Sequence, residues 1–233
     1  MIFKSQFESD ITQCNVFSLE VERDYRFAML DREIKKCKGH IITKICAGDI
    51  ALINFLLQKE FGVCGTTLFV ESCLKQSDYV KIPLGTFVNL MQDDENELFR
   101  ICEDAFAQNN RYANDPVLCK FNLNIHREWI RNSINGYADY NCGYSVGGCL
   151  QGFGTLHFRD EYSVIGLFAI DKQHRNKGIG SKILKNLNSV SLQHGRTKIR
   201  AATESNNYAA LNIYSKHDYL FYDSKVCLYR KAL

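Results

Sequence analysis

Apolar runs alternate with helical patterns along most of this chain, and the alternation predicts an α/β protein. Near the C-terminus, Tyr162–Ile170 is a continuous apolar run rich in β-branched and aromatic residues, which is typical of a buried strand. After a glycine-rich turn, apolar residues recur at helical spacing from residue 182 to about residue 194. The sequence therefore predicts a strand, a turn and a helix in this region.

The same patterns predict the other elements. Strands are expected over residues 14–22, 40–47, 66–71, 144–150, 152–158, 198–203 and 225–229. Helices are expected over residues 25–37, 49–60, 93–107, 119–135 and 207–217, the second of them capped by Asp49. The polar segments over residues 75–85 and 109–116 each carry a proline and are expected to be a linker and a loop.

A strand–helix–strand pattern occurs twice, over residues 41–70 and 198–229. When the two copies are aligned, these positions coincide: Asp49 with Asn207, Asn54 with Asn212, Leu56 with Tyr214 and Phe61 with Tyr219. The repetition predicts two related halves. The glycine turn falls in the second half alone.

Composition narrows the class of protein. The 233 residues are 45% hydrophobic and 24% charged, with a net charge of +3, which is ordinary for a globular protein. No basic block supports a nucleic-acid role. No run reaches the roughly 20 apolar residues of a membrane-spanning helix, and the first residues lack a signal-peptide core. A cytoplasmic protein with no membrane partner is expected.

The ten cysteines are scattered, with no Cys-x-x-Cys pair and no Cys/His cluster at zinc spacing. Most fall within apolar runs, as Cys227 does. The sequence predicts that they are reduced and buried, acting as small hydrophobic residues, and it predicts no metal site.

Residues 173–181, Gln-His-Arg-Asn-Lys-Gly-Ile-Gly-Ser, form the glycine turn. A helix that begins here directs its free N–H groups and the positive end of its dipole to one point, where a phosphate can bind. Gly178 and Gly180 can adopt positive φ and allow close approach of a ligand. Arg175 and Lys177 add positive charge at the rim.

Three features of the C-terminal half together resemble the GNAT superfamily of acyl-CoA N-acyltransferases. The first is the turn from Arg175 to Gly180, and the second is Asn207-x-x-Ala210-x-x-x-Tyr214 on a later helix. The third is their separation by one helix and one strand. The resemblance covers about residues 140–233 and implies a mixed central sheet flanked by helices. The chain departs from the family pattern in having Asp-Tyr at residues 218–219, where many members have Gly-Phe.

The resemblance implies acetyl-CoA or another short acyl-CoA as cofactor, bound mainly within residues 162–217. It also implies a catalytic domain over residues 81–233 and a degenerate GNAT-like domain over residues 1–80. The residues implied to contact the cofactor are Leu167, Phe168, Ala169, Ile170, Arg175, Asn176, Lys177, Gly178, Ile179, Gly180, Ser181, Asn207 and Tyr214.

Tyr214 is the residue that this pattern favours for catalysis. Attack of an amine on a thioester creates an oxyanion and expels a thiolate, and a phenol, whose pKa is ordinarily about 10, can protonate that thiolate. A backbone N–H near Phe168 or Ala169 is expected to stabilise the oxyanion. The strand itself carries no acid. The candidates for the general base are His157, Glu161, Glu204 and water.

A narrower resemblance concerns the acceptor. Residues 106–116, Phe-Ala-Gln-Asn-Asn-Arg-Tyr-Ala-Asn-Asp-Pro, followed by a helix with Trp129, are similar to a segment of TDP-fucosamine acetyltransferase and related N-acyltransferases of TDP-linked amino-deoxy sugars. The resemblance implies a nucleotide-sugar substrate and is compatible with a homodimer. An arginine can pair with a diphosphate and an aromatic ring can stack on a base or sugar. The substrate-binding candidates are Arg111, Tyr112, Asp115 and His157.

Other interpretations of the sequence stay open at this point. Residues 109–116 can be an ordinary turn-rich loop, and Trp129 can belong to the core. The acceptor can instead be the amine of a protein, a polyamine or an antibiotic. The chain can also be a CoA-binding module without catalysis.

Overall fold

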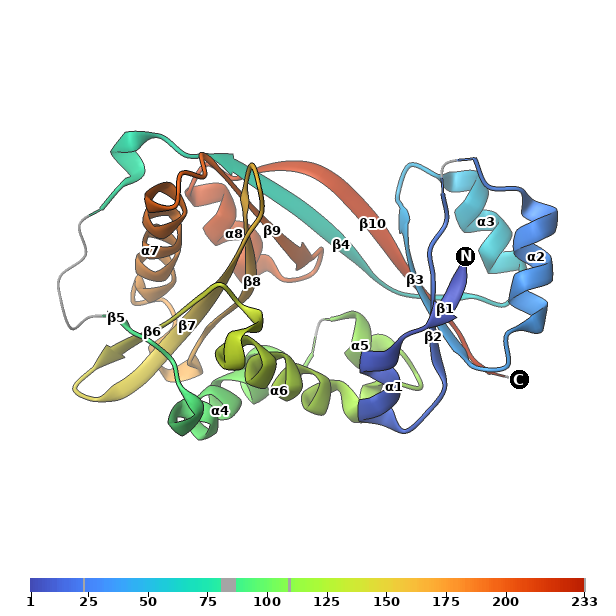
Figure 1. Ribbon diagram of the computed structural model, residues 1–233, viewed down its shortest axis with the longest axis horizontal. Helices are drawn as coiled ribbons and strands as arrows, with labels where there is room; N and C mark the ends of the chain where they lie inside the picture. Colours follow the sequence, from blue (N-terminus) through green and yellow to red (C-terminus); the bar gives the residue numbers. More distant parts are fainter. Residues whose placement is uncertain (23, 81–86, 109, 233) are drawn as a thin grey trace.

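The computed structural model describes residues 1–22, 24–80, 87–108 and 110–232. Figure 1 shows two lobes, one around α7 and α8 and the other around α2 and α3, joined by the long arched strands β4 and β10. The helices α1, α5 and α6 lie beneath this arch. The fold is α/β, as the sequence predicts.

The strands are β1 (Ile2–Lys4), β2 (Val16–Leu19), β3 (His40–Cys46), β4 (Gly62–Cys73), β5 (Phe87–Val88), β6 (Tyr140–Val146), β7 (Cys149–Phe158), β8 (Ser163–Ile170), β9 (Lys198–Glu204) and β10 (Leu220–Arg230). The α-helices are α1 (Gln6–Thr12), α2 (Phe27–Lys36), α3 (Ile50–Gln58), α4 (Glu95–Ala105), α5 (Arg111–Asn114), α6 (Asn122–Asn132), α7 (Ile179–Gln193) and α8 (Tyr208–Lys216).

The ten strands in the described part of the chain form one mixed sheet in the order β1-β2-β3-β10-β4-β9-β8-β7-β6-β5. The last strand of each half is exchanged between the halves. β10, from the end of the chain, pairs with β3, while β4, from the first half, pairs with β9. The two halves therefore share one sheet. The expected domain boundary after residue 80 falls just before residues 81–86, which lie outside the described part of the chain, and it stays a prediction.

The repeated unit of the sequence is repeated in the structure. With Phe61 aligned on Tyr219, β3 and α3 coincide residue for residue with β9 and α8. Asp49 and Asn207 both cap the helix that follows, through a side chain that accepts an N–H three residues on. The residue before each of the aligned aromatics has a left-handed conformation, with φ of 66° at Glu60 and 59° at Asp218. The halves thus share local geometry where few residues are identical.

Each face of the sheet carries its own layer of helices. α7 and α8 pack over an apolar cluster that includes Ile183, Leu187 and Ile199, and α2 and α3 pack over a second cluster on the same face. α4 and α6 cover β7 and β8 on the other face, around Leu98 and Phe153.

Most predicted elements are confirmed, and the differences have local causes. Residues 147 and 148 are glycines with positive φ that form the turn between β6 and β7, so the predicted strand over residues 144–150 ends too late. The expected loop over residues 109–116 contains the short helix α5, because the Asn110 side chain accepts the N–H groups of Tyr112 and Ala113. β1, α1 and β5 are short and were not predicted.

All ten cysteines are free, but the expectation that they are buried is wrong for most of them. Those with buried side chains are Cys64, Cys102, Cys142 and Cys227, Cys37 is half-buried, and those with exposed side chains are Cys14, Cys46, Cys73, Cys119 and Cys149. Alternate positions of a half-covered strand face outward even within an apolar run, which explains Cys46 and Cys73. Within the described ranges, no helix is long and apolar enough to cross a membrane, and no cluster of three His, Cys, Asp or Glu side chains could hold a metal ion.

Candidate functional site

β8 and β9 separate from each other partway along the sheet. Their parallel pairing joins Ser163 to Ile199 and Val164 to Arg200, although both strands continue for several residues beyond these pairs. In the remaining part of β8, residues 165–170 face β9 without pairing to it. An unpaired strand edge of this kind can hydrogen-bond an extended amide chain as if it were another strand.

A distortion in β7 helps to direct β8 into this opening. The register between β7 and β8 shifts between Gly154 and Leu156, and the Leu167 N–H donates to the Thr155 hydroxyl at 2.8 Å instead of to a carbonyl. Because successive N–H groups of a strand point to opposite edges, the N–H of Phe168 points into the opening. Of the two expected oxyanion donors, Phe168 therefore has the suitable direction.

The glycine turn lies at the end of β8, where α7 begins. Asn176 and Gly178 both have left-handed backbones, with φ of 61° and 77°. A β-carbon added at Gly178 would meet nothing within 4 Å, so the backbone there is open to a ligand. The first hydrogen bond of α7 runs from the Lys182 N–H to the Gly178 carbonyl at 3.2 Å. The three N–H groups before it are free to bind an anion.

Two residues of the turn differ from the sequence-based expectation. Gly180 has no positive φ: it lies inside α7, and a β-carbon there would come 2.6 Å from Cδ1 of Ile213 on α8. It is small because two helices pack together at that point. Arg175 is exposed, but its guanidinium bonds Asp104 at 2.5 Å and the Ile170 carbonyl at 3.3 Å, so its charge is partly offset.

Tyr214 lies on α8 and its ring packs beside β8. The side chain is 3% exposed, with ring centroids 6.5 Å from Phe168 and 5.1 Å from Tyr219. Burial raises the pKa of the Tyr214 phenol well above its usual value, so the hydroxyl keeps its proton at neutral pH. Among the described residues, the hydroxyl has no hydrogen-bond partner. It is a free proton donor beside the opening.

The Asn207 side chain stabilises the start of a helix. Its side chain accepts the Ala210 N–H at 3.3 Å and so caps α8, the helix that carries Tyr214. We expect Asn207→Ala to lower the free energy of unfolding by about 1 kcal/mol, because the cap is lost. Thermal unfolding should show a fall in Tm of about 2–4 °C. Asn207→Asp preserves the accepting oxygen, so an equal loss in that variant would contradict the capping role.

Two groups that could accept a proton lie on the face of β8 and β9 that is opposite to α8 and Tyr214. His157 on β7 is buried, and its Nε2 is 2.8 Å from the position of a β-carbon on Gly166. Burial and Arg159 lower the pKa of His157, so the ring is neutral at pH 7. Oε2 of Glu204, at the end of β9, is buried with no hydrogen-bond partner in the described part of the chain. Glu161 is exposed in the turn before β8, away from the opening.

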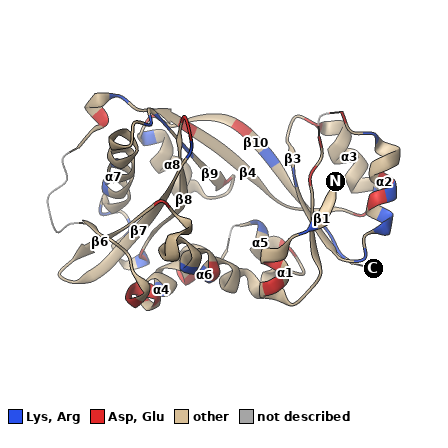
Figure 2. Cartoon of the chain, viewed as in Figure 1, with Lys and Arg blue, Asp and Glu red and all other residues tan. Residues whose placement is uncertain are grey.

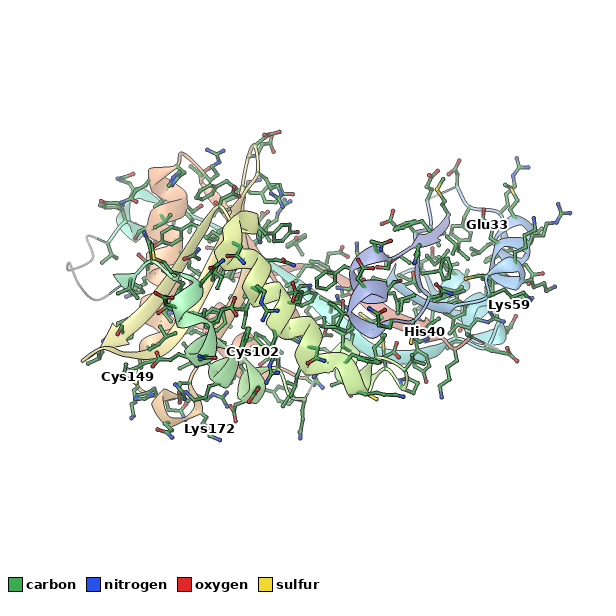
Figure 3. All side chains as sticks on the ribbon, turned by 60° about the horizontal axis from the view of Figure 1, so that its bottom comes forward. Glu33, His40, Lys59, Cys102, Cys149 and Lys172 are labelled. Carbon is green, nitrogen blue, oxygen red and sulfur yellow. The ribbon has the colours of Figure 1, made fainter. Side chains whose placement is uncertain are left out.

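The three residues predicted from segment 106–116 come together at one pocket of about 490 Å³. Tyr112 donates to Glu8 at 2.7 Å, and the Asp115 carboxylate bonds Nε2 of His40 at 2.7 Å, so both serve internal contacts. His40, labelled in Figure 3, comes from the N-terminal lobe. Arg111 lies over the rings of Tyr112 and Trp129, and its guanidinium is the member of the group that remains available to a ligand.

Similarity to known proteins shows the family to which the chain belongs. Residues 98–219 match the sequence profile of the acetyltransferase (GNAT) family. The chain belongs to that family. It is also 28% identical over 184 residues to the spore coat polysaccharide biosynthesis protein SpsD of Bacillus subtilis, a match that covers 76% of this chain and 61% of SpsD. The chain thus spans about three-fifths of the length of this curated relative.

Solved structures share the fold of this GNAT chain. A conserved protein of unknown function from Staphylococcus epidermidis superposes with a TM-score of 0.69 at 12% identity, over 97% of this chain and 89% of that one. A GCN5-related N-acetyltransferase from Sphaerobacter thermophilus gives a TM-score of 0.65 at 13% identity, over 99% of this chain and 75% of that one. At these identities the likeness concerns the fold alone.

Sequence reasoning missed two lysines that line the same pocket as Arg111. Lys44 lies on β3 and Lys225 on β10, and each is flanked by apolar residues on its C-terminal side, Ile-Cys after Lys44 and Val-Cys-Leu after Lys225. A lysine next to apolar strand residues was the signal available in the sequence. The strand exchange that brings β3 and β10 together was not predictable from the pattern of either strand.

Proposed function

We propose that this GNAT protein transfers an acyl group from acyl-CoA to the amine of a nucleotide-linked amino-deoxy sugar. The observation that carries the acyl-transfer part is the arrangement around β8: an unpaired strand edge, free N–H groups at the start of α7, and a protonated Tyr214 beside them. The acceptor part rests on two likenesses, one to SpsD and one between residues 106–116 and enzymes that acylate TDP-linked amino sugars.

In this proposal, the residues of the opening bind the donor. The edge of β8 at residues 167–170 holds the pantetheine arm by backbone hydrogen bonds. The N–H groups of Ile179, Gly180 and Ser181 bind the pyrophosphate, with Asn176 and Lys177 at the rim of the turn. The chain's own residues fit such a donor, since the edge is unpaired and the space beside Gly178 is open.

The transfer step then uses groups on both faces of β8. The Phe168 N–H donates to the oxygen that becomes negatively charged as the amine adds to the thioester carbonyl. His157 or Glu204 takes the proton that the amine releases. As the carbon–sulfur bond breaks, Tyr214 donates its phenolic proton to the departing thiolate. The balanced result is an amide and a free thiol.

The proposal is tested by following free thiol release from acetyl-CoA and 3-hydroxybutyryl-CoA in the presence of TDP-linked amino-deoxy sugars. We expect thiol release that depends on the sugar and a product whose mass increases by that of the acyl group. Polyamines and peptides with free amines serve as controls for acceptor class. Release with those amines and none with any nucleotide-linked sugar would overturn the acceptor assignment.

A further inference from the structure

The pocket beside α5 has a charge pattern that the acyl-transfer chemistry does not use. It lies between β2, β3, β10 and α5, and three cationic side chains reach it: Lys44, Arg111 and Lys225. We infer that these three side chains bind the diphosphate of the acceptor, an inference that rests on the proposed function. Figure 2 shows basic segments on α5 and on the arched strands around this region.

None of the three cations forms an ion pair with a carboxylate of the described chain, although Glu204 lies near enough to favour the charged forms of Arg111 and Lys44. Arg111 donates one hydrogen bond, to the Tyr112 hydroxyl at 2.7 Å, which leaves most of its five N–H groups for a ligand. Nζ of Lys225 lies 5.5 Å from the ring centroid of Phe69, and Lys44 forms no ion pair with any described residue. Three unpaired cations around one cavity favour an anion with more than one charge.

The acidic side chains of the pocket are mostly engaged elsewhere. Glu8 accepts from the hydroxyls of Tyr112 and Ser5, and Asp115 accepts from His40 and from two backbone N–H groups. Glu20 is exposed at the rim. Since the carboxylate oxygens of Glu8 and Asp115 accept hydrogen bonds from within the protein, the side chains that remain available to a ligand are predominantly cationic.

The surroundings of Lys44 disfavour its charged form. Although this side chain opens into the cavity, the surrounding protein atoms and the nearby Arg111 lower the pKa of Lys44 to about 8. A bound diphosphate would favour the charged ammonium and oppose both effects.

The pocket lies next to the transfer site along the sheet. A β-carbon on Gly65 would be 3.3 Å from Oε2 of Glu204 and 3.8 Å from Cα of Arg111, so one glycine adjoins both groups. In the sheet, Lys225 pairs with Thr67, and Thr67 pairs with Glu204. β10 is therefore two strand spacings from β9, about 10 Å. A sugar ring fits between a diphosphate over β10 and an amine at the opening.

The inference is tested with Lys44→Gln and Lys225→Gln, each of which removes one charge while keeping a side chain of similar length. The probes are thymidine diphosphate and coenzyme A, measured by calorimetry, together with the KM for a TDP-linked amino sugar. Each variant should bind thymidine diphosphate about tenfold more weakly and raise the KM for the sugar nucleotide by a similar factor. Affinity for coenzyme A and kcat should not change. Lys198→Gln, an exposed lysine at the start of β9, is the matched control.

The outcomes separate the two proposals. Acylation of a TDP-linked amino sugar with an unchanged KM in both lysine variants would overturn the diphosphate site and leave the proposed function standing. Lysine-dependent binding of thymidine diphosphate without acylation of any such sugar would support the site and overturn the acceptor assignment. Weaker binding of coenzyme A in either variant would mean that the cations serve the donor, and would overturn the inference.

Discussion

Tyr214→Phe should lower kcat at least about 100-fold, because the thiolate would leave without a proton donor. The removed hydroxyl makes no hydrogen bond to any described residue, and the ring contacts with Phe168 and Tyr219 are retained by phenylalanine. The affinity for coenzyme A and the Tm should therefore stay close to those of the wild type. Steady-state thiol release, calorimetry and thermal unfolding measure the three quantities.

A neighbouring buried tyrosine provides the matched control. Tyr219 also packs in the core, but its hydroxyl donates to Asn188 at 2.7 Å. Tyr219→Phe should therefore lower the free energy of unfolding by about 1 kcal/mol and leave kcat nearly unchanged. If Tyr214→Phe retains wild-type kcat, Tyr214 is not the acid. If the two variants lose activity equally, the effect is one of packing.

The sequence predicts the fold best where one local pattern decides the structure. The strand at Tyr162–Ile170, the helix cap at Asp49 and the left-handed turn at Gly178 all follow from short stretches of residues. The separation of β8 from β9 did not follow, since it depends on a register shift between β7 and β8. Pairing between distant strands is set by the whole sheet and leaves little trace in any one strand.

The candidate site likewise has a part that local sequence predicts and a part that depends on distant residues. The glycine turn and Tyr214 were identified from local spacing, whereas the role of each residue in segment 106–116 depends on partners far away in the chain. Tyr112 meets Glu8 of α1, and Asp115 meets His40 of β3. Both partners belong to the half of the sequence that carries the weaker patterns. An aromatic ring or a carboxylate in a binding motif can therefore hold the motif in place without touching a ligand.

If Asp115 holds its segment in place, Asp115→Ala should lower the free energy of unfolding. The carboxylate is 1% exposed and accepts from His40 at 2.7 Å and from the N–H groups of Val117 and Leu118 at 2.8 and 3.0 Å. Removing it leaves three donors without an acceptor, two of them buried and that of Val117 partly buried, which we expect to cost about 3 kcal/mol. The Tm should fall by about 6–12 °C in thermal unfolding.

The matched control is Asp160→Ala, which removes an exposed carboxylate from the turn before β8 and should leave the Tm within a degree or so. If Asp115 instead contacted the acceptor, its removal would raise the KM for the sugar nucleotide and leave the Tm unchanged. The structure favours the first result, because the contacts to His40, Val117 and Leu118 hold this carboxylate inside the protein. Asp115 therefore fixes the segment after α5 to β3, and so keeps Arg111 directed into the pocket.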